Sequence, residues 1–141
     1  MKITQEADYA LRVVAYLSKM GYGNKITAAK IAEEENIPMR FLLKLLRKLK
    51  AAGIIESILG VGGGYTLKKL PEDITLKDVI EAVDGPIYIN RCLYDPEKCN
   101  LKRASRCNVH NALRKIQQIL VTELGSINFK DIVISDTGNQ N

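Results

Sequence analysis

The chain has 141 residues, of which 46% are hydrophobic, and it carries a formal net charge of +5. This length suits one compact domain, or one domain with an appendage. The apolar runs are too short to span a bilayer and no apolar signal segment is present, so we expect a cytoplasmic protein without a membrane partner. Three cysteines, an odd number, argue against structural disulfides and favour metal or redox chemistry.

The excess of positive charge lies entirely in the first half of the chain. Residues 1–70 contain twelve Lys and Arg against six Asp and Glu, whereas residues 71–141 contain nine against ten. A basic module beside a nearly neutral one is typical of a polyanion-binding domain joined to a second functional region. We therefore expect a polyanion-binding domain over residues 1–70 and a second unit over residues 71–133. Residues 134–141, at the chain end, are expected to form a disordered tail.

Hydrophobic periodicity and capping signals predict three helices in the first half. Thr4 and Thr27 are typical N-cap residues, and they precede helices expected over residues 5–20 and 28–35. A third helix is expected over residues 38–52. Its apolar face is formed by leucines with i, i+3, i+4, i+7 spacing, namely Leu42, Leu45, Leu46 and Leu49.

Two short strands follow, over residues 54–58 and 65–67, and a glycine-rich turn between them favours a hairpin. Two helices, a basic helix and a hairpin, in this order, are typical of a winged helix-turn-helix. In such a domain the third helix enters the major groove of double-stranded DNA and the hairpin contacts the flanking backbone. The residues that we expect at the DNA interface are Thr27, Pro38, Arg40, Lys44, Arg47, Lys48, Gly60, Gly62, Gly63 and Tyr65.

The second half begins with a capping box and ends with a long helix. Thr75 and Asp78 have the spacing of a capping box, which predicts another helix. After a loop over residues 86–105, a long helix with an apolar face is expected over residues 106–124. Few elements of the same chain can cover that face, so we expect a homodimer, which would present two recognition helices to an operator. The expected fold is mainly α with a small β-hairpin: a winged helix-turn-helix followed by a long C-terminal dimerisation helix.

The three cysteines and the only histidine lie within nineteen residues of the second half, in the pattern C-x6-C-x7-C-x2-H: Cys92, Cys99, Cys107 and His110. Zinc sites usually contain tight C-x2-C pairs, so these wider gaps favour a larger iron–sulfur centre held from several sides. A structural zinc site and redox-reactive thiols are the alternatives. The last cysteine and the histidine are one helical turn apart and can face the same way, although the histidine could also point to solvent.

Further motifs carry a family resemblance. They are Ala7-Asp8-Tyr9-Ala10-Leu11-Arg12, Asn36-Ile37-Pro38, Gly60-x-Gly62-Gly63-Gly64-Tyr65 and Thr75-Leu76-x-Asp78-Val79-Ile80. Together with the three-cysteine loop, they make the chain similar over about residues 1–133 to the Rrf-type winged-helix regulators of bacteria, with IscR-like, NsrR-like and CymR-like branches. The resemblance implies a homodimeric DNA-binding transcriptional regulator, a repressor that senses iron–sulfur, redox or nitric oxide status.

In cluster-binding members of this family, three cysteines hold a [2Fe-2S] or [4Fe-4S] centre, which carries over to Cys92, Cys99 and Cys107. The fourth ligand is a histidine after the third cysteine in one branch, here His110, and an acidic residue from the first helix of the other subunit in another, here Asp8. Both are present in this sequence, so both branches stay open. A cluster-free regulator with structural zinc or redox-active thiols is the alternative. An alternative from another functional class is a small redox protein that does not bind DNA. We do not expect an enzyme, because the sequence shows no catalytic acid–base pair.

Overall fold

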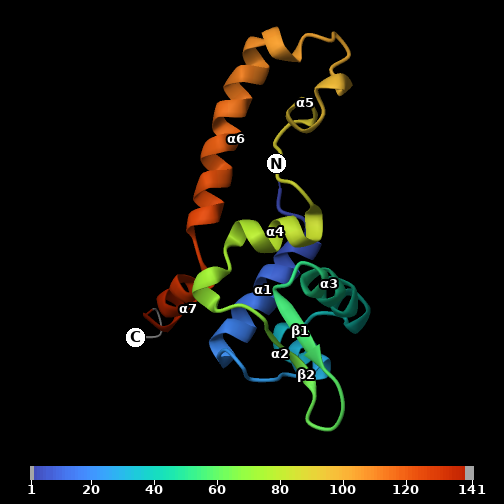
Figure 1. Ribbon diagram of the computed structural model, residues 1–141, viewed down its shortest axis with the longest axis vertical. Helices are drawn as coiled ribbons and strands as arrows, with labels where there is room; N and C mark the ends of the chain where they lie inside the picture. The colour runs from blue at the N-terminus through green and yellow to red at the C-terminus, as the bar shows by residue number, and fades with distance from the viewer. Residues whose placement is uncertain (1, 139–141) are drawn as a thin grey trace.

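A computed structural model describes the backbone of residues 2–138, and Figure 1 shows its arrangement. The helices are α1 (Gln5–Met20), α2 (Ala28–Glu35), α3 (Met39–Ala51), α4 (Leu76–Asp84), α5 (Arg91–Tyr94), α6 (Asn108–Ser126) and α7 (Phe129–Gly138). Short 3-10 turns lie at Pro71–Asp73, Pro96–Lys98 and Ala104–Arg106. The strands β1 (Ile55–Ile58) and β2 (Gly64–Leu67) form an antiparallel hairpin. This confirms the predicted fold class, a mainly helical winged helix-turn-helix with a small β-hairpin.

Three threonine N-caps begin helices as predicted. The Thr4 hydroxyl accepts a hydrogen bond from a backbone N–H in the first turn of α1 at 3.1 Å, and Thr27 does the same for α2 at 3.2 Å. Thr75 and Asp78 form both hydrogen bonds of the predicted capping box at the start of α4. These side chains satisfy N–H groups that have no acceptor within their own helix, which fixes where each helix begins.

One hydrophobic core joins both halves of the chain. The four leucines of α3 are almost completely buried in it against the apolar face of α1. Val79 and Val83 of α4 and Phe129 of α7 are buried in the same core. The core therefore crosses residue 70, and α4 and α7 belong with the winged helix to one compact body.

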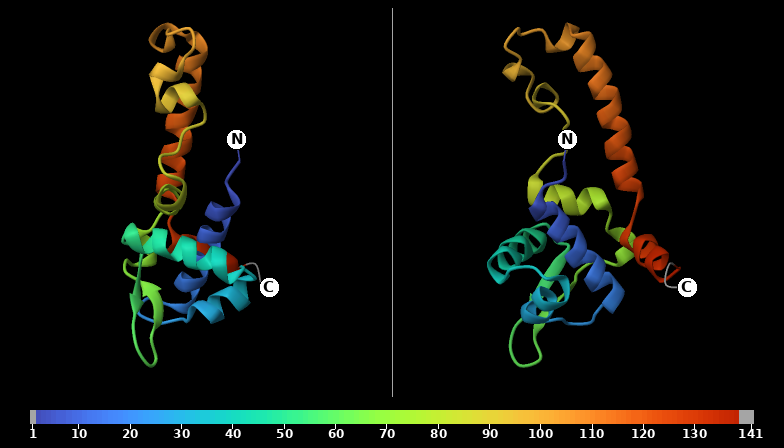
Figure 2. Two further views of the ribbon diagram at one scale, coloured as in Figure 1. Left: turned by 90° about the vertical axis from the view of Figure 1, so that its right-hand side faces the viewer. Right: turned by 180° about the vertical axis from the view of Figure 1, so that it is seen from behind.

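Residues 86–126 form an arm that projects from this body (Figures 1 and 2). One side of the arm is α6, which begins and ends two residues later than predicted, and the other side is the segment 86–107, which includes α5. No residue of α6 is buried, although the structure describes the whole helix. The apolar face predicted on α6 is therefore only partly covered within one chain. Neither α6 nor any other helix in the described residues is long and apolar enough to cross a membrane.

A helix extends into the predicted C-terminal tail. α7 runs to Gly138, so residues 134–138 continue a helix where the sequence predicts a disordered tail, and residues 139–141 lie outside the described range. Contacts at its first residues stabilise this helix. Phe129 is buried in the core, and the Asn128 side chain accepts a 3.0 Å hydrogen bond from a backbone N–H of the first turn.

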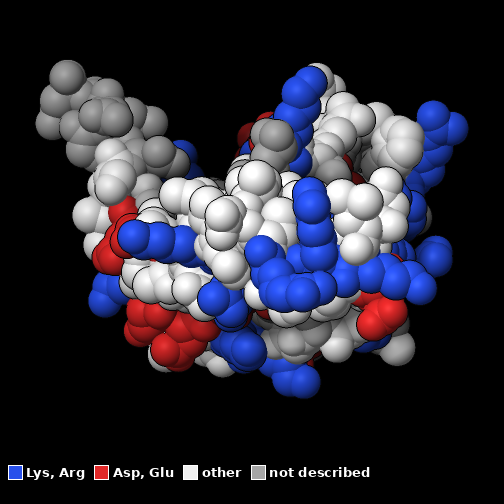
Figure 3. All heavy atoms as spheres, turned by 90° about the horizontal axis from the view of Figure 1, so that it is seen from above, with Lys and Arg blue, Asp and Glu red and all other residues white. Residues whose placement is uncertain are grey.

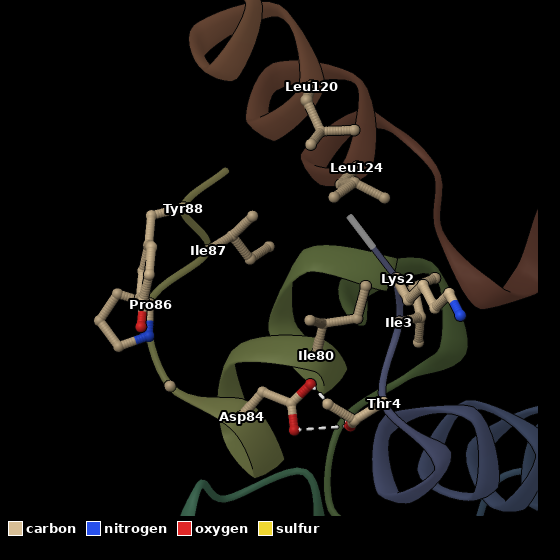
Figure 4. Close-up of a pocket in the computed structure, with 11 residues that line it drawn as sticks. Lys2, Ile3, Thr4, Ile80, Asp84, Pro86, Ile87, Tyr88, Leu120 and Leu124 are labelled. Atoms are coloured by element: carbon tan, nitrogen blue, oxygen red, sulfur yellow. Dashed lines mark hydrogen bonds between the residues drawn. The ribbon is translucent and has the colours of Figure 1, made fainter. Parts of the chain in front are cut away.

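At the base of the arm lies a cavity of about 410 Å³ between α4, α6 and the N-terminal segment (Figure 4). Ile80, Leu120 and Leu124 give it apolar walls. At its rim, the Thr4 hydroxyl lies 2.8 and 2.9 Å from the two carboxylate oxygens of Asp84 and donates its hydrogen to them. Thr4 therefore caps α1 and also ties it to the last residue of α4, directly before the arm begins.

Candidate nucleic-acid interface and metal centre

The recognition helix α3 has a buried face and an exposed basic face. Burial of its four leucines leaves Arg40, Lys44 and Arg47 exposed, as their helical spacing predicts. The Arg40 guanidinium lies over the ring of Phe41, with 4.8 Å between its central carbon and the ring centroid. Leu43 is also exposed here, so the surface combines positive charge with an apolar contact. Such a surface can bind phosphates and also contact bases.

Lys48 also lies on α3, but its ammonium group does not belong to this exposed surface. It lies 2.9 Å from a carboxylate oxygen of Glu6 on α1 and donates a 3.0 Å hydrogen bond to the carbonyl oxygen of Val83 on α4. The structure therefore places this predicted DNA contact at the junction of three helices of the body. Its two partners are distant in sequence, which is why the pattern of α3 alone could not reveal them.

The wing is a tight hairpin with an apolar tip. Gly60 and Gly62 have φ values of +94° and +76°, which favour glycine. A Cβ atom at Gly63 would lie 2.2 Å from the carbonyl oxygen of Ile58, so this turn also needs a glycine. The exposed side chains of the tip are Leu59 and Val61, at 91% and 110% of the reference area. The tip can thus approach DNA through its backbone but presents no positive charge of its own.

The remaining predicted contacts of the DNA-binding domain lie at element starts. Thr27 and Pro38 are the exposed N-cap residues of α2 and α3. The backbone N–H groups at the start of a helix can face a phosphate. Tyr65 exchanges backbone hydrogen bonds with Ile26 at 2.8 and 2.9 Å and packs against the core. Tyr65 therefore holds the wing against the start of α2.

The three cysteines lie at the far end of the arm, in residues 91–107, which we call the arm apex. Cys92 is in α5, Cys99 follows the second 3-10 turn, and Cys107 directly precedes α6. Local caps shape these turns: Asp95 accepts a 3.2 Å hydrogen bond from the N–H of Glu97, and Pro96 follows Asp95. All three cysteines are partly buried and none is in a disulfide, and all lie within the described residues.

Two of the four predicted ligands in this loop are adjacent. The Nδ1 atom of His110 lies 3.2 Å from the Sγ atom of Cys92. A sulfur and a nitrogen bound to one tetrahedral metal would lie roughly 3.5 Å apart, so this pair is close enough to bind one metal atom. Among the side chains that the structure describes, those of residues 2–135, however, no three His, Cys, Asp or Glu side chains converge as metal ligands would. The structure thus brings Cys92 and His110 together, but not Cys99 and Cys107 with them.

Asp8, the other candidate fourth ligand, lies in the body rather than in the arm. It is in the first turn of α1, where its carboxylate forms an exposed ion pair with Arg12 at 3.5 Å. In the views of Figures 1 and 2, α1 and the arm apex lie in different parts of the molecule. Asp8 could therefore join the cysteines only if it came from a second copy of the chain.

One thiol of the arm apex, that of Cys99, has a shifted pKa. Backbone hydrogen bonds from Arg103 and Leu101 lower the pKa of the Cys99 thiol from its ordinary value, and burial opposes them only in part. A lower pKa raises the fraction of thiolate, which is the form that binds metal. The chemistry of three thiols and an imidazole thus fits an iron–sulfur or zinc centre.

Many Lys and Arg side chains lie on the face of the molecule seen from above in Figure 3. Residues 86–115 contain only two acidic residues, Asp95 and Glu97. The exposed basic residues of the same stretch are Arg91, Lys98, Lys102, Arg103, Arg106, Arg114 and Lys115. The net charge of residues 71–141 does not reveal these basic residues, because acidic residues elsewhere in that half cancel their charge. A shorter window of sequence would have revealed them. Positive charge stabilises nearby thiolates.

The fold and the exposed basic face of α3 define the class of this protein, a winged-helix transcriptional regulator that binds DNA. Residues 3–135 match the Rrf2 family, which is described as an iron-dependent transcriptional regulator. The chain belongs to this family, whose members are regulators of transcription and not enzymes.

Relatives and solved structures agree with this assignment. The regulator IscR of Aliivibrio salmonicida is 28% identical over 140 residues, which cover 99% of this chain and 82% of the relative. CymR, the global cysteine regulator of Bacillus subtilis, is 29% identical and has a TM-score of 0.75, with 96% of this chain and 98% of that chain covered. IscR of T. potens, at 20% identity, has the same fold with a TM-score of 0.80 over 100% of this chain and 92% of that one.

Proposed function

We propose that this regulator is a homodimeric repressor that senses iron–sulfur, redox or nitric oxide status through a [2Fe-2S] or [4Fe-4S] cluster in the arm apex. The observation that carries the proposal is the 3.2 Å approach of His110 Nδ1 to Cys92 Sγ, in the loop that contains the other two cysteines. The family description, iron-dependent, agrees with a metal-containing centre. A regulator of this class acts where the DNA is, which in a bacterium is the cytoplasm.

Cys92, Cys99 and Cys107 would hold the cluster, with His110 as the fourth ligand. Two observations favour His110 over Asp8: it is already adjacent to Cys92, whereas Asp8 is paired with Arg12 in the body. When bound, the cluster supplies a centre that reacts with oxidants and nitric oxide. The residues of the chain supply three cysteine sulfurs and an imidazole on α6.

A second copy of the chain would cover the exposed apolar side of α6. Val109, Ile116 and Ile119 lie on this side with 65%, 56% and 53% of their surface exposed. An apolar stripe of this kind on a long helix needs a partner, because a helix is stable in water only when its apolar face is covered. Two-fold pairing through α6 would place one recognition helix on each side of the dimer, as a palindromic operator requires.

The DNA contacts would come from Arg40, Lys44 and Arg47 in the major groove and from backbone groups of the wing. Contacts within the body, at the last turn of α4 just before the arm, suggest how the two sites communicate. Lys48 of the recognition helix binds Val83, which lies just before the start of the arm, and Thr4 binds Asp84 beside it. A movement of the arm would therefore reach α3 through the last turn of α4.

Operator binding by the two forms of the protein tests this function. The DNA upstream of its own gene is the first probe, with anaerobic protein measured before and after removal of the cluster. We expect affinities that differ by at least about fivefold, the usual lower range for allosteric coupling. Equal affinities would overturn the sensing function, and no binding to any promoter fragment would overturn the DNA-binding role. Full activity in a colourless, zinc-containing protein would instead support the cluster-free alternative.

A further inference from the structure

The two sides of the arm are joined by one side-chain hydrogen bond below the arm apex. The backbone N–H of Ile89, on the segment that rises from the body, donates to Oε1 of Gln117 on α6 at 2.9 Å. Both residues are partly buried. Because an isolated chain segment can slide along a helix, a bond of this kind sets which residues of the segment face which residues of α6.

The same bond stands in a fixed relation to the pair at the apex. Gln117 is two helical turns from His110 on the same side of α6, and Ile89 is three residues before Cys92. The rings of Tyr88 and Tyr94 stack with 4.8 Å between their centroids, so the segment folds back on itself around Cys92. The hydrogen bond fixes the segment on α6, and the ring pair fixes Cys92 within the segment.

We infer that Gln117 is a positioning residue that holds Cys92 next to His110. It forms a hydrogen bond with Ile89 rather than with either of them, and acts through the register of the segment 86–91 on α6. This inference rests on the proposed function only in taking Cys92 and His110 as ligands of one centre. Replacement of Gln117 by leucine would leave the Ile89 N–H without its acceptor, and we expect the two ligands to meet roughly fivefold less often, since a hydrogen bond contributes about that factor.

The first experiment measures this proximity without any cluster. In full-length protein with Cys99→Ser, Cys107→Ser and His110→Cys, only positions 92 and 110 carry thiols. The effective concentration of one thiol at the other is obtained from the equilibrium between their disulfide and a glutathione buffer. We expect Gln117→Leu to lower it about fivefold and Gln117→Glu, which keeps an acceptor oxygen, to leave it within twofold. Gln118→Leu, the exposed neighbour on α6, is the matched control and should also have no effect.

A fall of the same size in Gln117→Glu, or no fall in Gln117→Leu, would overturn the inference. Failure of the parent pair to form a disulfide would overturn it as well, because the two positions would then not be adjacent. The second readout is the visible and paramagnetic spectrum of anaerobic protein with native cysteines and His110. There, Gln117→Leu should shift the spectrum toward that of His110→Ala, and Gln117→Glu should resemble the parent. A protein without a cluster would overturn the proposed function, but the disulfide measurement would still test whether Gln117 positions Cys92 next to residue 110.

Discussion

Lys48 donates a 3.0 Å hydrogen bond from its ammonium group to the carbonyl oxygen of Val83, and so joins the recognition helix to the last turn of α4. The same ammonium group forms a 2.9 Å ion pair with Glu6. Three helices of the body meet at this one cation. Because the arm starts just after α4, Lys48 links α3 to the helix that leads into the arm.

Lys48→Met should remove this link while it keeps the aliphatic part of the side chain. We expect a loss of about 1 kcal/mol in the free energy of unfolding, a modest value because both members of the ion pair are about one-third exposed. We also expect a smaller difference in operator affinity between cluster-loaded and cluster-free protein. Urea unfolding followed by circular dichroism measures the first effect, and DNA titration the second.

The control for this variant is Lys44→Met on the exposed face of α3. It should weaken DNA binding but change stability by less than about 0.5 kcal/mol, as is usual for exposed positions. If both variants gave the same pattern, Lys48 would have no role at the helix junction.

Arg47→Ala should weaken DNA binding without unfolding the domain. Removal of one phosphate contact should reduce the slope of log affinity against log salt by about 1. Fluorescence anisotropy with a labelled promoter fragment over a range of salt concentrations measures this. Lys130→Ala, an exposed lysine on α7, is the control and should leave affinity and slope unchanged. An unchanged slope in Arg47→Ala would exclude this residue from the DNA interface.

Ile116→Glu should separate the dimer. It places a charge in the exposed apolar side of α6, and burial of an unpaired charge in an interface is strongly unfavourable. Sedimentation equilibrium should give the mass of one chain for this variant and of two chains for the parent. Gln118→Glu, on the opposite side of α6, should remain dimeric. A dimer that persists in Ile116→Glu would show that α6 does not form the interface through this side.

Thr4→Ala should destabilise the body through two losses at once. The hydroxyl caps α1 and also binds Asp84, so we expect about 1–2 kcal/mol less free energy of unfolding. Thr4→Ser keeps the hydroxyl and should retain most of the stability. Urea unfolding of both variants measures the difference. Equal losses in the two would mean that the methyl group, rather than the hydroxyl, matters at this position.

The elements of the body were predictable because their signals are local. Thr75 and Asp78 are three residues apart, and the leucines of α3 repeat within three turns, so a short window contains the whole signal. The role of Lys48 was not predictable, because Val83 is 35 residues away and only the packing of α3 on α4 brings them together. Burial of Phe129 at the start of α7 likewise depends on a core built from residues far away in the sequence.

The candidate metal centre was predictable in composition but not in arrangement. The concentration of cysteines with one histidine is visible in the sequence, whereas the adjacency of Cys92 and His110 depends on how the segment 86–91 lies along α6. The basic surface of the arm apex was hidden by averaging over too long a stretch.

The most direct test of the account is the iron, sulfide and zinc content of protein purified without oxygen, measured together with its visible absorption spectrum. We predict a coloured protein with iron and acid-labile sulfide in equal amounts, and loss of both in Cys92→Ala, Cys99→Ala and Cys107→Ala. A colourless protein with one zinc per chain, or with no metal, would contradict the proposed iron–sulfur sensor.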